Sequence, residues 1–385
     1  MQVHSEPAVL AIPETGAGVR LDCIVGARPN FMKMAPILAE VRRRPQFSAR
    51  LIHTGQHFSP EMSDTFFREL EMPQPDINLE AGGGSATAQT ADIMRRLEPL
   101  FRENRPDLVM VVGDVNSTMA AAIVATQLGI PVAHVEAGLR SFDRTMPEEI
   151  NRILTDAISQ FLFITEPSGM ANLLSEGVPQ EKIYPVGNVM IDTLLKFREK
   201  ARRSTVLEQH GLEPAAYAVV TLHRPSNVDA PERLRDLYAV LVELSHSLPV
   251  IFPVHPRTRL RLSEMAGEPA PGLLLVPPLG YLDFLRLMSE ARLVLTDSGG
   301  IQEETTVLGV PCLTLRENTE RPITVEQGTN RLIGVDPAAV LDAARHTLGH
   351  RLTGGRIPEL WDGRAAERIV DVLAAHAAEL VARRP

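Results

Sequence analysis

The chain alternates short apolar runs of strand length with longer amphipathic stretches of helical length. The apolar runs that we expect to form strands are residues 22–25, 49–53, 108–112, 131–136, 161–164, 218–221, 250–254, 273–276, 293–296 and 311–315. Helical patterns lie between them, for instance at 32–44, 117–128, 232–247 and 281–290. The expected strands are nearly continuous in apolar residues, which is typical of strands buried on both faces. The alternation therefore predicts an α/β fold of parallel sheets covered by helices.

The length of 385 residues exceeds that of a typical single hydrophobic core, so we expect two domains. We place their boundary near Gly187 and Asn188, with an N-terminal α/β domain over 21–187 and a C-terminal one over 188–385. We expect residues 1–20 to form a flexible extension. The last helical pattern, 365–382, has no strand after it and can cross back to the N-terminal domain. Parallel sheets of this kind bind ligands beyond the carboxyl ends of their strands.

Charge, cysteine content and the length of apolar stretches argue against several classes of protein. The net charge is −9 and no dense Lys/Arg cluster is present, so we expect no nucleic-acid partner. Cys23 and Cys312 lie inside apolar runs and are expected to be buried thiols, too few to build a zinc site by themselves. No stretch has the roughly 18 apolar residues of a membrane span. Glu6 and Glu14 interrupt the N-terminus, which is unlike a signal peptide, so the expected compartment is the cytoplasm.

The first expected strand runs into the segment GARPN, which is followed by a helical pattern that carries Lys33. This segment lacks the G-x-G-x-x-G fingerprint, so we expect no NAD and no transient oxidation of a substrate. Arg28 and Lys33 are cations at a helix start, where they oppose the helix dipole. Such a pair indicates an anionic ligand nearby, although two solvated cations would give the same pattern.

Acidic residues follow two neighbouring apolar runs. Asp114 comes directly after the run 108–112, and Glu136 closes the run 131–136. Glu148 follows shortly, in the first turn of a helical pattern. Each has a structural alternative, since Asp114 can cap a helix and Glu148 can face a helix dipole. Together they place three carboxylates near one sheet edge, as proton-transfer chemistry requires.

The second half carries residues suited to an anionic ligand. His223 follows the run 218–221 and can bind phosphate, act as a general acid or be a structural histidine. The segment Ser298, Gly299 and Gly300 joins a strand pattern to a helical one, which is a favourable phosphate site. Glu304 lies one turn into that helix, where it can accept hydrogen bonds from ribose hydroxyls. Arg321 adds a cation at another helix start.

No D-x-D motif and no close cluster of His, Asp and Glu is evident in the sequence, so we expect no metal. A metal-dependent glycosyltransferase is therefore disfavoured. A glycosyltransferase of the same two-domain architecture would not need three carboxylates in the N-terminal half. A binding protein without catalysis would be expected to have lost some of those acids, and all of them are present.

Ordered sequence blocks resemble the non-hydrolysing UDP-N-acetylglucosamine 2-epimerases over about residues 21–335. The blocks are GARPNFMKMAPI, HTGQHF, GDVNST, HVEAGLRSFDRTMPEEINR, VGNVMIDTL, TLHRPSN, TDSGGIQEE and TERP. The resemblance implies two Rossmann-like domains in a GT-B-like arrangement, a UDP-sugar in the central cleft, and a homodimer. It implies reversible epimerisation at carbon 2 of UDP-N-acetylglucosamine, giving UDP-N-acetylmannosamine for surface polysaccharide precursors.

The resemblance also assigns roles to individual residues. The residues matching the family's acid/base carboxylates and its histidine near the diphosphate are Asp114, Glu136, Glu148 and His223. The residues matching its substrate contacts are Arg28, Lys33, Phe284 on the uracil side, Ser298, Gly299 and Gly300 in the phosphate loop, Glu304 at the ribose, and Arg321.

The sequence departs from the better-known bacterial form at two places. Phe58-Ser59-Pro60 follows TGQH, and Pro225-Ser226 follows HR, where that form has Arg-Glu pairs. In the family these segments help to form a second, regulatory substrate site, so we expect no allosteric activation. The pattern of GARPNF, TGQHF and SFDRTMPEE also resembles relatives acting on diacetamido-uronic acid nucleotides, and the hydrolysing 2-epimerases share most motifs. Both remain alternatives.

Overall fold

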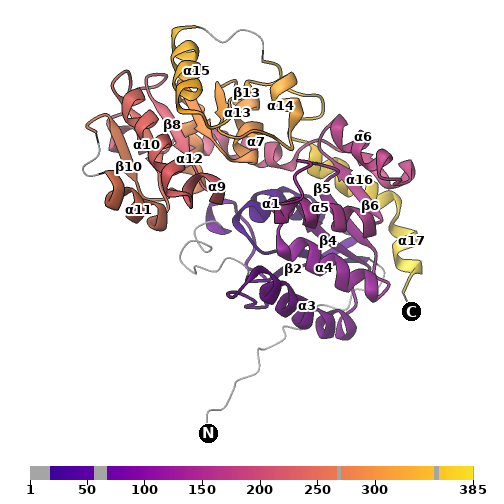
Figure 1. Ribbon diagram of the computed structural model, residues 1–385. Coiled ribbons are helices and arrows are strands. Elements are labelled where there is room, and N and C mark those ends of the chain that lie inside the picture. Colours follow the sequence, from indigo (N-terminus) through magenta and orange to yellow (C-terminus); the bar gives the residue numbers. More distant parts are fainter. Residues whose placement is uncertain (1–17, 56–66, 267–269, 351–354, 385) are drawn as a thin grey trace.

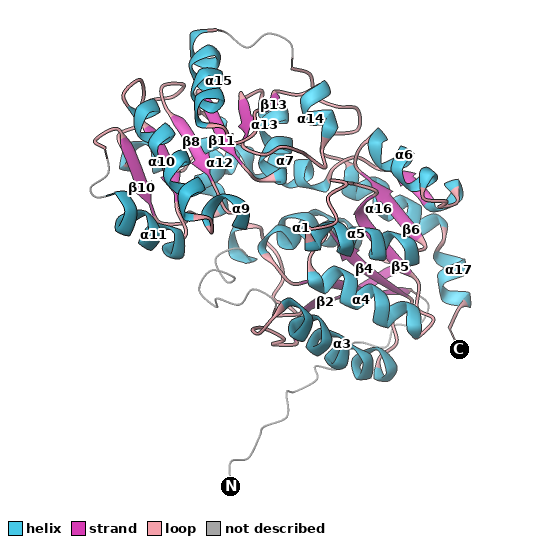
Figure 2. Cartoon of the chain, in the orientation of Figure 1, coloured by secondary structure: helices cyan, strands magenta, loops and turns pink. Residues whose placement is uncertain are grey.

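The computed structural model describes residues 18–55, 67–266, 270–350 and 355–384, and these contain two parallel β-sheets flanked by helices (Figures 1 and 2). The first sheet has seven strands in the order β3-β2-β1-β4-β5-β6-β7. Its strands are β1 Val19–Val25, β2 Phe47–His53, β3 Ile77–Asn78, β4 Leu108–Val112, β5 Val132–Ala137, β6 Phe161–Ile164 and β7 Ile183–Pro185. The helices that follow these strands are α1 Arg28–Arg42, α3 Ala86–Glu103, α4 Asn116–Gln127, α5 Pro147–Ile158 and α6 Pro167–Ser175, and the short 3-10 helix η1 is Gln180–Lys182.

The second sheet has six strands in the order β10-β9-β8-β11-β12-β13. They are β8 Ala218–Thr221, β9 Val250–Pro253, β10 Leu273–Val276, β11 Leu293–Thr296, β12 Cys312–Thr314 and β13 Asn330–Leu332. The helices of this half are α8 Val206–Gln209, α9 Pro225–Val228, α10 Pro231–Ser245, α11 Pro256–Ala266, α12 Tyr281–Ser289, α13 Gly299–Leu308, α14 Pro322–Glu326 and α15 Pro337–Gly349. The expected α/β fold with two parallel sheets is confirmed.

Three strands were not expected from the sequence: β3, β7 and β13. Each contains only two or three residues and lies at an edge of its sheet. So short a segment produces no apolar run, because few of its side chains enter the core.

The single helix expected over 365–382 is divided into two helices, α16 Ala365–Ala375 and α17 Ala377–Ala382. They are separated at His376, whose ring Nδ1 lies 2.9 Å from the carbonyl oxygen of Val372.

The C-terminal segment lies on the half of the molecule that contains the first sheet (Figure 1). α16 packs against α1, and the indole nitrogen of Trp361 donates to the carbonyl of Thr165 at 2.9 Å. Gly187 has φ +87°, and a Cβ there would lie 2.1 Å from the carbonyl oxygen of Leu360. The chain therefore needs glycine where it leaves the first sheet. The division into domains near this residue stays a prediction.

α7 Val189–Ala201 connects the two halves and packs against α1 on one side and α12 and α13 on the other. Its Asp192 accepts hydrogen bonds from the backbone nitrogens of Ala365 and Ala366, the first residues of α16. A carboxylate at a helix N-terminus is favourable because it faces unpaired N–H groups and the positive end of the dipole. α7 thus contacts helices of both halves as well as the returning helix α16.

The two cysteines are buried thiols, as expected, one in β1 and one in β12. Burial raises the pKa of the Cys312 thiol to about 12. None of the helices in the described part of the chain combines the length and the apolar composition of a membrane span.

Candidate active site

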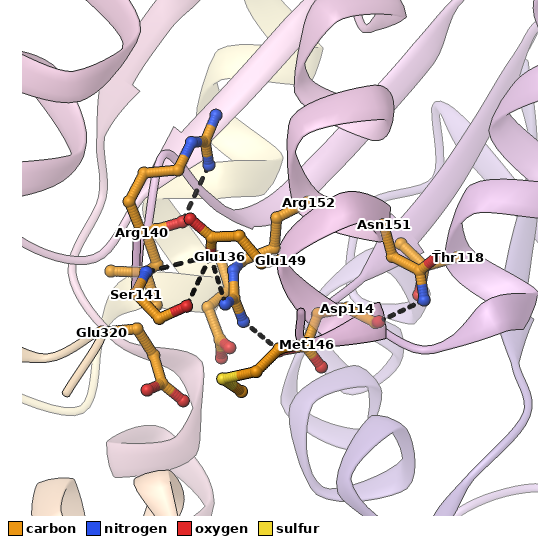
Figure 3. Close-up of polar contacts among 12 residues, drawn as sticks. Asp114, Thr118, Glu136, Arg140, Ser141, Met146, Glu149, Asn151, Arg152 and Glu320 are labelled. Carbon is orange, nitrogen blue, oxygen red and sulfur yellow. Dashed lines mark hydrogen bonds and ion pairs between the residues drawn. The ribbon is translucent and has the colours of Figure 1, made fainter. Parts of the chain in front are cut away.

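Asp114 and Glu136 lie at the carboxyl ends of β4 and β5, which are adjacent in the first sheet (Figure 3). Glu136 has φ +73°, and the pairing of β5 with β6 shifts register between Val135 and Ala137. Such a bulge redirects a side chain out of the regular alternation of a strand. A non-glycine residue with positive φ also stores about 1–3 kcal/mol of backbone strain, which surrounding contacts must hold.

The carboxylate of Glu136 lies between a cation from each half of the molecule. Lys33 Nζ, from α1, is 2.6 Å from Oε2, and Arg321 Nη2, at the start of α14, is 3.0 Å from Oε1. All three side chains are less than a tenth exposed. The structure therefore brings three of the expected site residues together, across the two sheets.

Arg321 is the centre of a wider ionic cluster. Its Nε is 2.9 Å from Glu303 and its Nη1 is 2.8 Å from Glu320. Burial raises the pKa of Glu303 to about 7, because Arg321 offsets the effect of burial only in part and the charge of Glu136 adds to it. Burial has the same tendency at Glu320, but Arg321 and two further arginines outweigh it and lower its pKa far below the usual range.

Two side chains of α5, the helix that follows β5, contact Asp114. Arg152 Nη1 is 2.5 Å from its carboxylate, and Asn151 Nδ2 donates to its carbonyl at 2.9 Å. Burial disfavours the charged form of Asp114, yet Arg152 and Lys33 more than compensate, so its pKa is lowered. Asp114 is thus held as an anion with 21% of its side chain exposed.

Glu148 lies in the first turn of the same helix and is half-buried. In the described part of the chain it forms no hydrogen bond or ion pair, unlike its neighbour Glu149. Glu149 is buried and accepts hydrogen bonds from the loop at Ser141 and Phe142. The two adjacent glutamates therefore differ: Glu149 fixes the loop, and Glu148 stays accessible.

In the second half, Asp297 organises the turn after β8. This buried carboxylate accepts hydrogen bonds from the backbone nitrogens of His223 and Arg224, and from the amide of Asn227. His223 Nδ1 also lies 2.8 Å from Asp297, and the imidazole is 62% exposed. Burial opposes ionisation of Asp297, but the contacts with His223 dominate and lower its pKa. The ring is thus oriented through one nitrogen while much of it faces solvent.

The expected phosphate loop precedes α13. Ser298 is the N-cap residue, and Gly299 and Gly300 begin the helix. A Cβ on Gly299 would lie 2.3 Å from Arg321 Nη1, so glycine allows the guanidinium to approach the helix start. Backbone N–H groups at a helix N-terminus beside an arginine form a site suited to a phosphate.

The other expected substrate residues are more dispersed. Glu304 is buried in α13 and accepts a hydrogen bond from the hydroxyl of Tyr281 at 3.3 Å. Phe284 is partly buried in α12 and packs against the apolar core. Arg28 begins α1, but its side chain lies outside the described part of the chain, as do residues 58–60. Pro225 and Ser226 are exposed at the start of α9.

Two features were missed from the sequence. One is Glu303, which reads as part of an ordinary helix. The other is the buried face of α5, which carries Glu149, Arg152 and Asp156. Their spacing of three and four residues places them on one side of a helix. A charged stripe of that period is a signal that the sequence does contain.

Known proteins match this chain closely. The family model for UDP-N-acetylglucosamine 2-epimerase matches residues 39–374. A UDP-N-acetylglucosamine 2-epimerase from Methanocaldococcus jannaschii is 41% identical over 364 residues, covering 92% of this chain and 99% of that protein. A UDP-2,3-diacetamido-2,3-dideoxy-D-glucuronate 2-epimerase from Pseudomonas aeruginosa is 38% identical, covering 91% of this chain and 98% of that protein.

Comparison with solved structures gives the same result as comparison with the sequences. The crystal structure of the Methanocaldococcus jannaschii UDP-GlcNAc 2-epimerase in complex with UDP-GlcNAc and UDP matches with a TM-score of 0.85 and 40% identity, covering 93% of this chain and 100% of that one. A UDP-glucosyltransferase from Polygonum tinctorium matches at 15% identity with a TM-score of 0.57, covering 96% of this chain and 100% of that one, and so shares only the GT-B-like fold. The chain belongs to the UDP-N-acetylglucosamine 2-epimerase family.

Proposed function

We propose that this protein interconverts UDP-N-acetylglucosamine and UDP-N-acetylmannosamine by reversible inversion at carbon 2. The observation that carries the proposal is the meeting of Glu136, from the first sheet, with Arg321, from the second. Carboxylates for proton transfer thereby lie beside the cation and phosphate loop suited to a diphosphate. The UDP-N-acetylglucosamine and UDP bound to the archaeal relative support the same substrate class.

The chemistry explains why acids and cations are combined. The hydrogen at carbon 2 of an N-acetyl sugar is not adjacent to a carbonyl, so its direct removal is prohibitive. When a carboxylate takes that proton, the C2–H electrons form a C1=C2 double bond as the C1–O bond to UDP breaks. The products of this step are a glycal and UDP. Protonation of carbon 2 on the opposite face and re-addition of UDP to carbon 1 then give the epimer.

We assign the proton transfers to Asp114, Glu136 and Glu148, which approach from the ends of β4 and β5 and from α5. Arg321, His223 and the loop at Ser298 stabilise the departing diphosphate by charge and hydrogen bonding. Lys33, which already contacts Glu136, is close enough to hold either the carboxylate or the substrate anion. On this assignment the N-terminal half moves protons and the C-terminal half retains UDP. No cofactor or metal is assigned to either step.

Proton NMR in heavy water tests the proposal. Incubation with UDP-N-acetylglucosamine should give UDP-N-acetylmannosamine that carries deuterium at carbon 2, because the carboxylates exchange protons with solvent. Full retention of the original hydrogen in the product would exclude elimination and re-addition. The same spectra report free N-acetylmannosamine, which would identify the hydrolysing reaction instead.

A second substrate is supported by the 38% identical Pseudomonas aeruginosa relative, whose name specifies a diacetamido-glucuronate nucleotide. The chemistry at carbon 2 would be unchanged, so the carboxylates do not discriminate between the sugars. Comparison of kcat/KM for the two UDP-sugars separates them. A higher value for the uronate would assign that substrate.

We further propose that the protein is a cytoplasmic homodimer. Support comes from α5, which exposes Ile150 and Leu154 while burying charged residues, the reverse of an ordinary surface helix. Phe142, in the loop before this helix, is 79% exposed. Apolar side chains gathered on one surface are typical of interfaces. Analytical ultracentrifugation measures the oligomeric state directly.

A further inference from the structure

His134 and Asp156 form a buried pair behind the acidic residues and have no part in the mechanism above. His134 lies in β5, two residues before Glu136, and Asp156 lies near the end of α5. The ring Nδ1 is 2.6 Å from Asp156 Oδ1, and both side chains are fully buried. This pair is separate from the cations that contact Asp114 and Glu136 directly.

Each member of the pair contacts one of the turns that carry the acids. His134 Nε2 is 2.8 Å from the carbonyl oxygen of Gly113, the residue before Asp114. Asp156 Oδ2 accepts a hydrogen bond at 3.0 Å from the nitrogen of Gly138, two residues after Glu136. A chain of three hydrogen bonds therefore joins the end of β4 to the end of β5.

The donors and acceptors in this chain are determined by the partners. A carbonyl oxygen can only accept, so His134 Nε2 donates to Gly113. Asp156 also contacts Arg140, whose Nη1 is 2.7 Å from Oδ2. Burial opposes ionisation of Asp156, but His134 and Arg140 outweigh it and lower the pKa of the carboxyl group. The ionised carboxylate of Asp156 thus accepts from Arg140 and from the backbone nitrogen of Gly138, and it lies next to the His134 ring.

The contact at Gly138 also bears on backbone strain. Glu136 has φ +73°, a conformation that costs free energy and persists only where neighbours hold it. Gly138 is fixed on both sides, since its nitrogen donates to Asp156 and its carbonyl accepts from Asn172 at 2.9 Å. Loss of the Asp156 contact would remove one of the two hydrogen bonds that hold the turn two residues beyond Glu136.

We propose that His134 and Asp156 are positioning residues that hold the Asp114 and Glu136 turns in the mutual geometry required for proton transfer. The inference rests on the epimerase activity proposed above, because it assigns those two carboxylates to the reaction. Positioning at this level is demanding, since a displacement of about 1 Å can lower a rate roughly 100-fold.

A merely stabilising pair would give the same contacts, so the test needs a matched control. Asp107 provides one, because it is buried, accepts a hydrogen bond from the nitrogen of Arg20 and pairs with Arg384. Asp107 directly precedes β4 and Asp114 follows it, so the two residues lie at opposite ends of this strand. Asp107→Asn therefore removes an equivalent buried carboxylate far from the turns.

The experiment compares Asp156→Asn, His134→Gln and Asp107→Asn with the wild type in steady-state kinetics and thermal unfolding. We expect Asp156→Asn and His134→Gln to lower kcat by roughly 10- to 100-fold while KM changes less than about threefold, because the residues that hold UDP lie in the other half. Asp107→Asn should lose stability and keep its kcat. His134→Gln leaves the Asp156–Arg140 ion pair intact and serves as the test if Asp156→Asn does not fold.

Two outcomes overturn the inference: near-normal kcat in folded His134→Gln and Asp156→Asn, or an equal loss in Asp107→Asn. A crystal structure of His134→Gln gives a readout that does not depend on activity. It should show the Gly113 and Gly138 turns displaced from each other, and unchanged turns would contradict positioning. An inactive wild type would instead refute the proposed function, so the two failures are distinguishable.

Discussion

Replacing Arg152 with methionine removes the cation that joins two carboxylates of the site. The Arg152 side chain is 2% exposed, and its two terminal nitrogens lie 2.5 Å from Asp114 and 2.6 Å from Glu149. Methionine retains an unbranched side chain but has no charge. Removing one partner of a buried ion pair typically costs about 3–5 kcal/mol, because the other charge is left without compensation.

The contacts left in place reduce that figure. Asp114 is 21% exposed, so water solvates part of its charge. Glu149 retains donors from the backbone of Ser141 and Phe142 and from the Ser141 hydroxyl. We therefore expect Arg152→Met to lower the free energy of unfolding by about 2–3 kcal/mol at pH 7. For a chain of 385 residues, whose unfolding entropy is about 0.8 kcal/mol/K, the corresponding fall in Tm is roughly 2–4 °C.

The loss should depend on pH in a defined direction. Burial opposes ionisation of Asp114 and Glu149, but Arg152 and, for Glu149, hydrogen bonds from the loop lower both pKa values in the folded protein. Their contribution to stability is therefore complete above the unfolded pKa of about 4 and is lost as pH falls through the folded values. Without Arg152 the pKa values rise, and protonation relieves the uncompensated charge. The difference in the free energy of unfolding between the wild type and Arg152→Met should therefore be smaller at pH 4.5 than at pH 7.

Thermal unfolding followed by circular dichroism at both pH values measures this gap. Arg50→Met is a matched control, because Arg50 forms a buried two-point pair with Asp22 in β1. We expect both variants to lose stability, and only Arg152→Met to lose kcat as well, since Asp114 is displaced. A loss below about 1 kcal/mol, or a normal kcat in Arg152→Met, would refute the reasoning.

Two further predictions concern the reaction. Asp114→Asn, Glu136→Gln and Glu148→Gln should each lower kcat by roughly 100-fold or more, and Glu148→Gln, which breaks no ion pair among the described residues, should leave folding little changed; near-normal rates in all three would contradict the assignment. The rate should depend hyperbolically on substrate, and the reverse reaction should start without added UDP-N-acetylglucosamine, because the Arg-Glu pairs of the regulatory site are replaced, in one case by Pro225 and Ser226. A sigmoidal rate curve, or a reverse reaction that needs added UDP-N-acetylglucosamine, would contradict this prediction.

Much of the site's location follows from the sequence because parallel strands end at a common edge. Asp114 and Glu136 each follow a long apolar run, and such runs fixed the positions of β4 and β5 to within a residue or two. Their proximity is then a consequence of β4 lying beside β5. The same logic places Ser298 and His223 together, since β8 and β11 are adjacent.

Other features depend on tertiary packing that no local pattern encodes. The contact between Arg321 and Glu136 depends on how the two halves meet, and the residues are separated by 185 positions. The positive φ of Glu136 depends on a bulge in the pairing with β6. The raised pKa of Glu303 depends first on burial at the same contact between the halves. None of these is visible as a periodicity in the sequence.

α5 provides the counter-charge of Asp114 and a hydrogen-bond acceptor for the turn beyond Glu136. Its inward face supplies Arg152 to Asp114 and Asp156 to the turn beyond Glu136, while its first turn presents Glu148. An ordinary surface helix would bury apolar residues on that face and could offer neither counter-charge nor hydrogen-bond acceptor. The helix therefore departs from the apolar pattern on the face that contacts the acids. In a sequence that otherwise follows its hydrophobic pattern, a charged stripe at helical spacing marks the element that organises the site.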